Sequence, residues 1–377
     1  FLEHYYGNPS SIHSLGSEVG KAMKIAREQV QALIGAEFDS EIIFTSCATE
    51  ATTTAIMSAI EAHPERKSIV TSKVEHPATL ELCENLQRKG YTIHWIGVDS
   101  KGRFDFPAYV RALSDDVALV SVMWANNETG TIFPIKQIVS AAKSQGVQVH
   151  VDGVQAVGKI PVDVKALGID MLSLSGHKFH APKGVGALYL KRGTRFRPLM
   201  RGGHQERGRR AGTENAAAII ALGKAAQLAQ RSIVESSGRI DFLRNRLEQG
   251  LLARIPSSFV TGNPLERVPN TTNIAVEYVE GEALLLLLNQ VGIAASSGSA
   301  CTSGSLEPSH VMKAMDIPFT AAHGTLRFSL SKFTQDSDVD RVLDELPPIV
   351  ERLRALSPYW DSVTGQPIEE NFTPAYA

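Results

Sequence analysis

The first half of the chain alternates between short apolar runs and longer segments with helical spacing. Residues 117–122 are apolar almost throughout, and residues 147–151 and 171–174 are similar, which is typical of strands buried on both faces. Strands and helices that alternate in this way form a mainly parallel sheet with helices on both faces. We therefore predict an α/β fold, with strands at residues 41–45, 68–71, 91–96, 117–122, 147–151 and 171–174 and helices at 49–62, 78–89 and 135–145.

A long helical segment at residues 213–252 follows, with Ala and Leu at helical spacing and charges on the opposite face. It leads into a second set of elements, which we divide from the first as a large domain (1–234) and a small C-terminal domain (235–377). In the small domain we predict strands near 273–276 and 325–329 and helices near 281–289 and 336–356.

Composition narrows the class of protein. The 377 residues are 43% hydrophobic, which suffices for a large core, and the net charge of −2 gives no basic field for nucleic acid. No apolar stretch approaches the roughly 20 residues of a membrane span. Three cysteines are too few for a disulfide framework, and no secretory signal opens the chain. We expect a cytoplasmic enzyme whose natural N-terminus lies upstream of Phe1.

Polar residues follow the predicted strands, where ligands bind in sheets of this kind. Asp152 ends one strand, Gln155 lies three residues later, and Lys178 follows the next strand within the segment SGHK. A pyridoxal phosphate site needs a lysine to hold the cofactor and a carboxylate to keep its ring nitrogen protonated. Lys178 suits the attachment of the cofactor, Asp152 its ring nitrogen and Gln155 its ring oxygen.

A phosphate group is suited to the helix that opens at Ala48 and Thr49, because free N–H groups and the helix dipole favour an anion there. Ser175 and His177 add side-chain donors. His76, in the segment EHP after another strand, is placed to stack on the cofactor ring.

Asn127, in the segment NNETG, is a candidate donor to the cofactor ring oxygen or to a substrate carboxylate. Arg327 lies inside an apolar strand, where an arginine without a partner is costly. A substrate α-carboxylate would supply a bidentate partner, and an internal salt bridge to an Asp or Glu is an equal alternative.

Each of these residues also has an ordinary structural explanation. Asp152 and Thr49 could be helix N-caps, and Ser175 could belong to a turn. Lys178 could lie on the surface, and His76 could be a loop histidine. Five strand ends that each offer a suitable polar group are harder to attribute to chance.

Cys301 lies in a run of small, hydroxyl-bearing residues, SSGSACTSGS, at positions 296–305. None of these side chains can fill a core, so we expect an exposed, mobile loop and a reactive thiol. Cys47 and Cys83 lie in or beside regular elements and are interpreted as packing residues. A mobile thiol together with Lys178 indicates sulfur chemistry on an amino acid.

The chain resembles the pyridoxal-phosphate cysteine desulfurases, the NifS/IscS-like members of the class V aminotransferase superfamily, and most of all their nitrogen-fixation branch. The matching segments span nearly the whole chain: GNPSS (7–11), ATE (48–50), EHP (75–77), NNETG (126–130), DGVQ (152–155), SGHK (175–178), RAGT (210–213), SGSAC (297–301) and RFSL (327–330). The chain starts after the strand with a DNATT-like segment that normally opens the family.

The resemblance implies a homodimer of the PLP-dependent transferase fold type I, with a mainly parallel seven-stranded sheet in the large domain and a smaller α+β C-terminal domain. The basic, glycine-rich segment 201–213, otherwise interpreted as a solvated loop or an anion-binding or subunit-contact loop, would bring Thr213 to the partner's phosphate. The other implied roles match those above: catalysis by Lys178, His76 and Cys301, cofactor binding by Ala48, Thr49, His76, Asn127, Asp152, Gln155, Ser175, His177 and Lys178, and substrate binding by Asn127 and Arg327.

The activity implied is removal of sulfur from L-cysteine, which gives L-alanine and a persulfide on Cys301. The sulfur would pass to an iron–sulfur scaffold protein, in the service of nitrogen fixation, and Cys301 is a possible transient iron–sulfur ligand. A selenocysteine lyase or another class V aminotransferase is the alternative within enzymes. A sulfur carrier or scaffold-binding protein with a vestigial cofactor site is the alternative outside them.

Overall fold

The computed structural model describes residues 3–297, 308–361 and 363–368, and the chain divides into two compact units. The first unit comprises Phe1–Ile96, Phe104–Ala125 and Phe133–Glu235. The second comprises Gly97–Arg103, Asn126–Ile132 and Ser236–Ala377. The short segments 97–103 and 126–132 therefore group with the second unit, although a single boundary in the sequence assigns them to the first.

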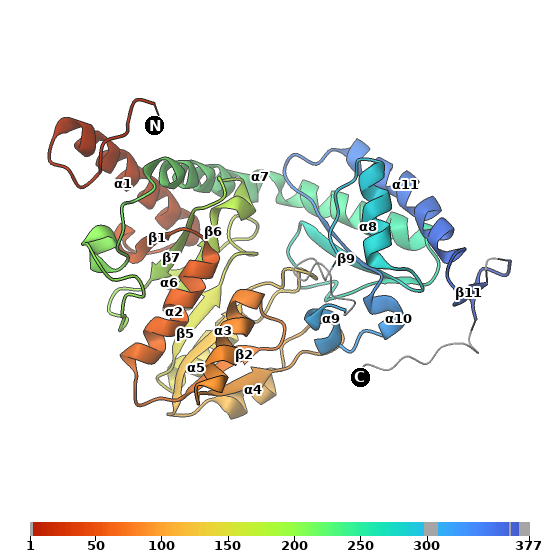
Figure 1. The fold of residues 1–377 in the computed structure, drawn as a ribbon, viewed down its shortest axis with the longest axis horizontal. Helices are drawn as coiled ribbons and strands as arrows, with labels where there is room; N and C mark the ends of the chain where they lie inside the picture. Colours follow the sequence, from red (N-terminus) through yellow and green to blue (C-terminus); the bar gives the residue numbers. More distant parts are fainter. Residues whose placement is uncertain (1–2, 298–307, 362, 369–377) are drawn as a thin grey trace. The chain divides into compact units, whose positions relative to one another are not determined.

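The first unit is built on a mixed, mostly parallel sheet with the strand order β1-β7-β6-β5-β4-β2-β3 (Figure 1). Strands β2 to β6 run parallel to their neighbours among themselves, and β7 is antiparallel to both β6 and β1. It follows that β1 runs in the same direction as β6. The strands are β1 (Ile42–Thr45), β2 (Ser68–Ser72), β3 (Thr92–Ile96), β4 (Val117–Met123), β5 (Gln148–Asp152), β6 (Met171–Ser175) and β7 (Gly186–Leu190).

The apolar pattern of the sequence explains these elements. Every residue of β4 is buried, as expected for a central strand covered on both faces. Helix α5 (Ile135–Ser144) buries Ile135, Ile138, Val139 and Ala142, which is the spacing of one helical face. The remaining helices of this unit are α1 (Ser14–Ile34), α2 (Ala48–Ala62), α3 (Pro77–Arg88), α4 (Phe106–Ala112), α6 (Val164–Leu167) and the start of α7 (Ala216–Arg254).

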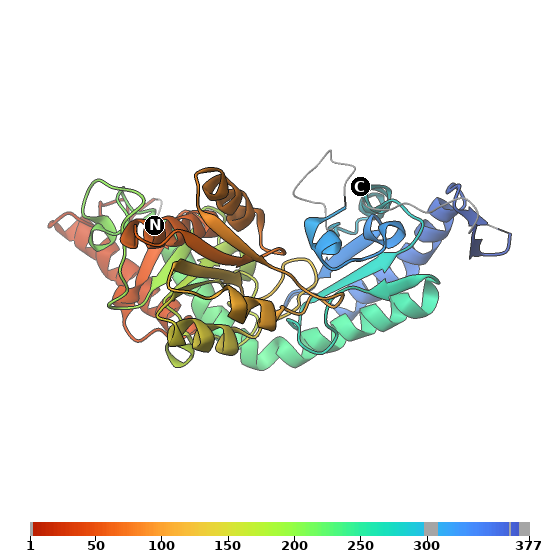
Figure 2. The same ribbon diagram turned by 90° about the horizontal axis from the view of Figure 1, so that it is seen from below.

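The second unit contains a small antiparallel sheet with the order β10-β9-β8 (Figure 2). It also has its own hydrophobic core. Leucines from the second half of α7, such as Leu247, pack with Leu288 of α8, Leu326 of β10 and Leu346 of α11. The elements are β8 (Ser258–Val260), β9 (Thr271–Val276), α8 (Gly281–Gln290), α9 (His310–Ala314), α10 (Phe319–Ala322), β10 (Thr325–Ser329), α11 (Asp336–Arg354), β11 (Trp360–Asp361) and β12 (Gln366–Pro367).

The predicted α/β class with a mainly parallel seven-stranded sheet is confirmed. The predicted strands and helices are present with ends shifted by a few residues at most, whereas α1, α4, α6, α9, α10, β7, β8, β11 and β12 were not predicted. Among the described residues, no helix combines the length and the apolar character needed to cross a membrane.

Candidate active site

Polar side chains gather at one edge of the sheet in the first unit. Because β1, β2, β5 and β6 run in the same direction, their carboxyl ends lie at this edge. Strand β1 leads into Ala48 and Thr49, and β2 leads through a short turn to His76. Strand β5 ends at Asp152, and β6 ends at Ser175, which directly precedes the turn that carries Lys178.

Lys178 lies in a 3-10 turn, η2 (Gly176–Phe179), immediately after β6. The turn requires a small residue at its start, because a Cβ on Gly176 would lie 2.8 Å from Leu222 Cδ1 and 2.9 Å from Ala181 Cβ. Burial lowers the pKa values of His76 and His177, and the positive charge of Lys178 lowers both further. The same charge acts against the rise that burial causes in the pKa of Asp152. The charge of Lys178 therefore acts on His76, His177 and Asp152 alike.

Asp152 is a buried carboxylate at the end of a central strand. Burial raises its pKa to about 6, and the N–H of Val154, which donates to Oδ1 at 2.9 Å, and the charge of Lys178 act against this rise. This is the one hydrogen bond found for the carboxylate within the described part of the chain. A cationic ring nitrogen beside this carboxylate would stabilise the ionised form.

His76 is the N-cap of α3, which continues with Pro77 at its first position. Its Nδ1 accepts a hydrogen bond from the N–H of Ala78 at 3.1 Å, so the proton of the neutral ring belongs on Nε2. Burial, followed by the charge of Lys178, lowers the pKa of His76. The result is a neutral, oriented ring that suits stacking on a flat cofactor.

The N-terminus of α2 is open to an anion. Its N-cap, Cys47, makes no side-chain hydrogen bond to the helix in the described structure, so the first N–H groups, near Ala48 and Thr49, are free of a cap. The nearby carboxylate of Glu50 is held by Arg210 Nε at 2.8 Å and by the N–H of Ser46 at 2.8 Å. That carboxylate is therefore neutralised and does not repel a phosphate from this terminus.

Gln155 and Thr213 complete the predicted cofactor residues in this unit. Lys159 Nζ donates a hydrogen bond to Oε1 of Gln155. The NH2 group of the same amide points away from Lys159 and can donate to another group. Thr213 lines a small cavity of about 170 Å³ with Ser46, Gly184 and Arg210. The described structure places Thr213 in its own chain only, so its predicted reach into a second subunit stays a prediction.

The segment before Thr213 is anchored to the first unit. Glu206, which is buried, accepts from Arg27 Nη1 and Nη2 at 2.7 Å each, and both Glu206 and Arg207 have positive φ, at 48° and 59°. Two successive left-handed residues without glycine are strained, and the buried ion pair is what holds them. These contacts favour an ordered anion-binding or subunit-contact loop over a loop that is only solvated.

In the second unit, the described structure brings Asn127 and Arg327 together. Arg327 Nη1 donates to the backbone O of Asn127 at 2.8 Å. Among the described residues no carboxylate lies within ion-pair distance of Arg327, although its charge acts against the rise that burial causes in the pKa of Glu128. The internal salt bridge that the sequence left open is therefore not found within the described part of the chain. The buried Nε of Arg327 and Oδ1 of Asn127 have no hydrogen-bond partner there, which is costly and fits an absent polar ligand.

Cys301, predicted to carry the sulfur and to be a possible metal ligand, lies outside the described residues. Elsewhere in the described ranges, His, Cys, Asp and Glu side chains form no cluster of three that could hold a metal ion. Cys83 is fully buried, and burial raises the pKa of its thiol to about 12, which fits a packing residue.

Sequence reasoning missed two buried acids beside the predicted residues. Glu75 precedes His76, and its Oε1 accepts from Ser72 Oγ at 2.5 Å and from the N–H of Met123 at 3.0 Å. Glu128 follows Asn127 and is also buried. Both lie inside segments that carry the family resemblance, but their neighbours in the sequence are mainly polar, so the local pattern gave no signal of their burial.

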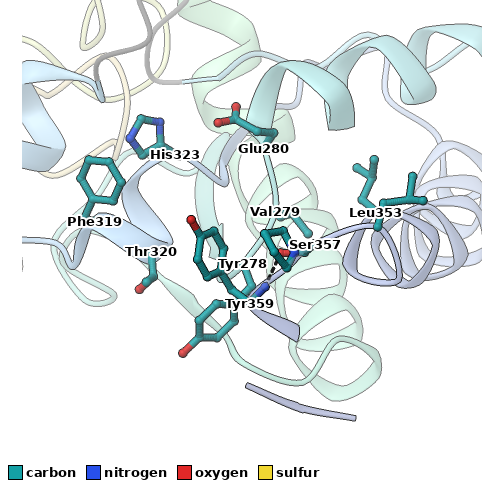
Figure 3. Close-up of a pocket in the computed structure, with 11 residues that line it drawn as sticks. Tyr278, Val279, Glu280, Phe319, Thr320, His323, Leu353, Ser357 and Tyr359 are labelled. Carbon is teal, nitrogen blue, oxygen red and sulfur yellow. Dashed lines mark hydrogen bonds between the residues drawn. The ribbon is translucent and has the colours of Figure 1, made fainter. Parts of the chain in front are cut away.

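A separate cavity of about 490 Å³ lies within the second unit (Figure 3). Aromatic residues line it, including Tyr278, Phe319 and Tyr359, and the rings of Phe319 and His323 meet edge to face at 4.4 Å. None of the residues predicted from the sequence lines this cavity. It is therefore not the predicted site.

Comparison with known proteins decides the family. A family model described as Aminotransferase class-V matches residues 1–342. The chain belongs to this family. It is 62% identical over 379 residues to the cysteine desulfurase NifS of Azotobacter vinelandii, and the alignment covers 100% of this chain and 94% of that protein.

Other members of the class V family agree. A cysteine desulfurase of Gluconacetobacter diazotrophicus is 58% identical over 378 residues, covering 100% of this chain and 94% of that protein. A solved structure titled NifS-like protein superimposes with a TM-score of 0.88 at 35% identity, over 94% of both chains. These findings confirm the predicted cysteine desulfurase family, its fold and its pyridoxal phosphate cofactor.

Proposed function

We propose that this class V enzyme removes sulfur from L-cysteine, releases L-alanine and leaves the sulfur as a persulfide on Cys301. The observation that carries the proposal is the shared environment of Lys178, His76 and Asp152 at one edge of the sheet. A lysine, a neutral ring and a buried carboxylate are the groups that a pyridoxal phosphate site needs, and they come from three different strand ends.

The residues of the first unit would hold the cofactor as follows. Lys178 is the attachment point, Asp152 pairs with the ring nitrogen, His76 stacks on the ring, and Gln155 donates to the ring oxygen. When bound, pyridoxal phosphate supplies an electron sink for the substrate carbon. The phosphate would be held by the open terminus of α2, by the residues Ala48, Thr49, Ser175 and His177, and by Thr213 of a second subunit.

The residues of the second unit would hold the substrate. A carboxylate fits the unpaired Nε of Arg327, because a guanidinium binds a carboxylate through two parallel hydrogen bonds. Asn127 would contribute its side-chain amide. The amine of Lys178 would remove the Cα proton, and Lys178 or His76 would return protons to the product.

Sulfur transfer needs no outside oxidant. The Cys301 thiolate attacks the sulfur of the substrate, a sulfur–sulfur bond forms, and the carbon–sulfur bond breaks. The electron pair of the broken bond stays with the carbon, which takes up protons and leaves as L-alanine. Cys301 retains the added sulfur as a persulfide.

We further propose that the enzyme works as a cytoplasmic homodimer and passes sulfur to an iron–sulfur scaffold protein. The 62% identity to the NifS protein of Azotobacter vinelandii supports a service to nitrogen fixation. A homodimer is what would bring Thr213 to a phosphate that its own chain does not hold.

An assay of L-cysteine turnover with product identification tests this function. With a thiol such as dithiothreitol present to reduce the persulfide on Cys301, the parent enzyme should release equal amounts of L-alanine and sulfide without a keto acid. Cys301→Ala should retain the visible absorbance of the bound cofactor and lose at least about a hundredfold in sulfide release, because it lacks the nucleophile. The nearby Ser303→Ala is the control and should stay active.

Two results would contradict the proposal. Full turnover by Cys301→Ala would remove the role of that thiol. A strict requirement for a keto acid would identify a transaminase instead.

A further inference from the structure

Glu128, a buried carboxylate in the second unit, is hydrogen-bonded to Ser309. Neither residue has a role in the function proposed above. Glu128 is 3% exposed, and its Oε2 accepts a hydrogen bond from Ser309 Oγ at 2.6 Å. Ser309 is itself buried and is the N-cap of α9, where its Oγ accepts from the N–H of Val311 at 3.1 Å. The hydroxyl of Ser309 therefore joins the start of α9 to Glu128.

The turn that carries Glu128 is fixed on several sides. Asn126 Oδ1 accepts from the N–H groups of Glu128 and Thr129, both at 2.9 Å, and the turn closes at Gly130, which has a φ of 77°. Asn273 Nδ2 donates to the backbone O of Glu128 at 3.4 Å. The backbone of Glu128 is therefore fixed at both its N–H and its O.

The same turn presents the residues proposed to bind the substrate carboxylate. Asn127, next to Glu128, accepts from Arg327 Nη1 through its backbone O at 2.8 Å. The backbone of Arg327 pairs with Ser296, whose O accepts from the N–H of Arg327 at 2.6 Å. Ser296 precedes Cys301 in the sequence, and its backbone is bonded to that of Arg327. Ser309 follows Cys301, and its hydroxyl is bonded to Glu128 in the turn.

We propose that Glu128 is a positioning residue for sulfur transfer: through Ser309 it ties the start of α9 to the turn that holds Asn127 and Arg327. This inference rests on the proposed function of Arg327 and Cys301. Ser309 follows Cys301 by eight positions, so this bond fixes one attachment point of the chain that carries the thiol relative to the substrate pair. Ser296, on the other side of Cys301, supplies the second attachment through β10.

Ser309→Ala and Ser309→Thr form the test pair, because threonine keeps the hydroxyl that alanine removes. The first measurement is the rate of L-alanine formation in a single turnover of L-cysteine, which follows sulfur transfer. The second is the dissociation constant of L-alanine, followed by the cofactor absorbance, which reports the carboxylate site without sulfur. We expect Ser309→Ala to lose about tenfold in the single-turnover rate, as befits one hydrogen bond to a carboxylate, with L-alanine affinity within about twofold of the parent. Ser309→Thr should recover the rate.

A readout that does not depend on the cofactor comes from a double-mutant cycle of Ser309→Ala with the apolar, similarly sized Glu128→Leu. In the cofactor-free protein, the urea midpoint of the double variant should match that of the less stable single variant, because both changes break the same bond. Strictly additive midpoints would overturn the inference, as would a parent-like single-turnover rate in Ser309→Ala.

Equal loss of L-alanine affinity and of rate in Ser309→Ala would also overturn it, since that pattern reports general damage. If Glu128→Leu does not fold, the alanine and threonine variants at position 309 still decide. Failure of the parent enzyme itself to form L-alanine would contradict the proposed function, and this inference with it.

Discussion

At the residue scale, burial sets the protonation of the acids at the sheet edge. Asp152 and Glu75 are both buried, and their negative charges interact, so burial and mutual repulsion raise the pKa of Glu75 to about 8. A neutral Glu75 can sit beside an ionised Asp152, which is the state that a cationic ring nitrogen requires. Ser72 Oγ and the N–H of Met123 orient Glu75 between β2 and β4.

Glu75→Gln should make the stability of the cofactor-free protein less sensitive to pH. Burial raises the pKa of Glu75 from its ordinary 4.5 to about 8, so between these values the folded protein keeps a proton that the unfolded chain loses. The stability linked to this proton is full below about pH 4.5 and is lost as the pH rises toward 8, by up to about 1.4 kcal/mol per pH unit. Urea denaturation from pH 5 to about pH 9 measures this.

The exposed Glu84→Gln is the matched control and should follow the parent. Parallel stability curves for Glu75→Gln and the parent would show that the carboxyl of Glu75 does not retain its proton.

At the scale of elements, the strand ends were predictable because strand–helix alternation places them at one edge. Asp152 and Lys178 follow from that pattern alone. Helix α1 could also have been predicted from the sequence, although it was not. Its apolar residues Val19, Met23 and Val30 recur at helical spacing and are buried. The direction of β7 was not encoded, because a five-residue apolar run looks the same in a parallel or an antiparallel pair.

Contacts between distant residues could not be predicted from local pattern. Glu128 and Ser309 are separated by 181 positions, and no periodicity reports such a pair. The same holds for the pairing of Arg327 with Asn127, where the sequence left a salt bridge and a substrate contact as equal alternatives. The roles of the site residues remain predictions that the proposed variants test.

A buried chain of hydrogen bonds links the elements that carry the cofactor residues. Thr52 Oγ1 of α2 donates to Ser173 Oγ of β6 at 3.1 Å, and Ser173 Oγ lies 2.7 Å from His150 Nε2 of β5. The other ring nitrogen of His150 lies 2.9 Å from Ser121 Oγ of β4. Burial lowers the pKa of His150 to about 3, so the ring is neutral and can link both hydroxyls.

Ser173→Ala should lower the free energy of unfolding by about 1–3 kcal/mol, because it leaves Thr52 and His150 with buried, unsatisfied polar atoms. Urea denaturation measures the loss. The exposed Ser144→Ala serves as a control and should change stability by no more than about 0.5 kcal/mol. A loss in Ser173→Ala as small as that of the control would show that the chain does not stabilise the sheet.

At the scale of the whole molecule, the predicted site residues fall into both units. Asn127 and Arg327 belong to the second unit, and the other cofactor residues belong to the first. The anchored loop before Thr213, with its buried Glu206–Arg27 pair, is the feature that would present Thr213 to a partner.

Mixed dimers test whether Thr213 acts across subunits. Thr213→Val should weaken cofactor affinity about tenfold, since it removes one hydrogen bond to a charged phosphate. In dimers that combine Thr213→Val with Lys178→Ala, one site would contain an intact lysine and an intact threonine, so cofactor titration should recover parent-like affinity at half of the sites. If Thr213 acts within its own chain, every lysine-bearing site keeps the weakened affinity.

The proposed function depends on Lys178 holding the cofactor beside Asp152 and His76. Borohydride reduction of the cofactor-loaded enzyme, followed by peptide mapping with mass spectrometry, locates the attachment directly. We expect the cofactor on Lys178 and no label in Lys178→Ala. Attachment to any other lysine, or to none, would contradict the proposed function.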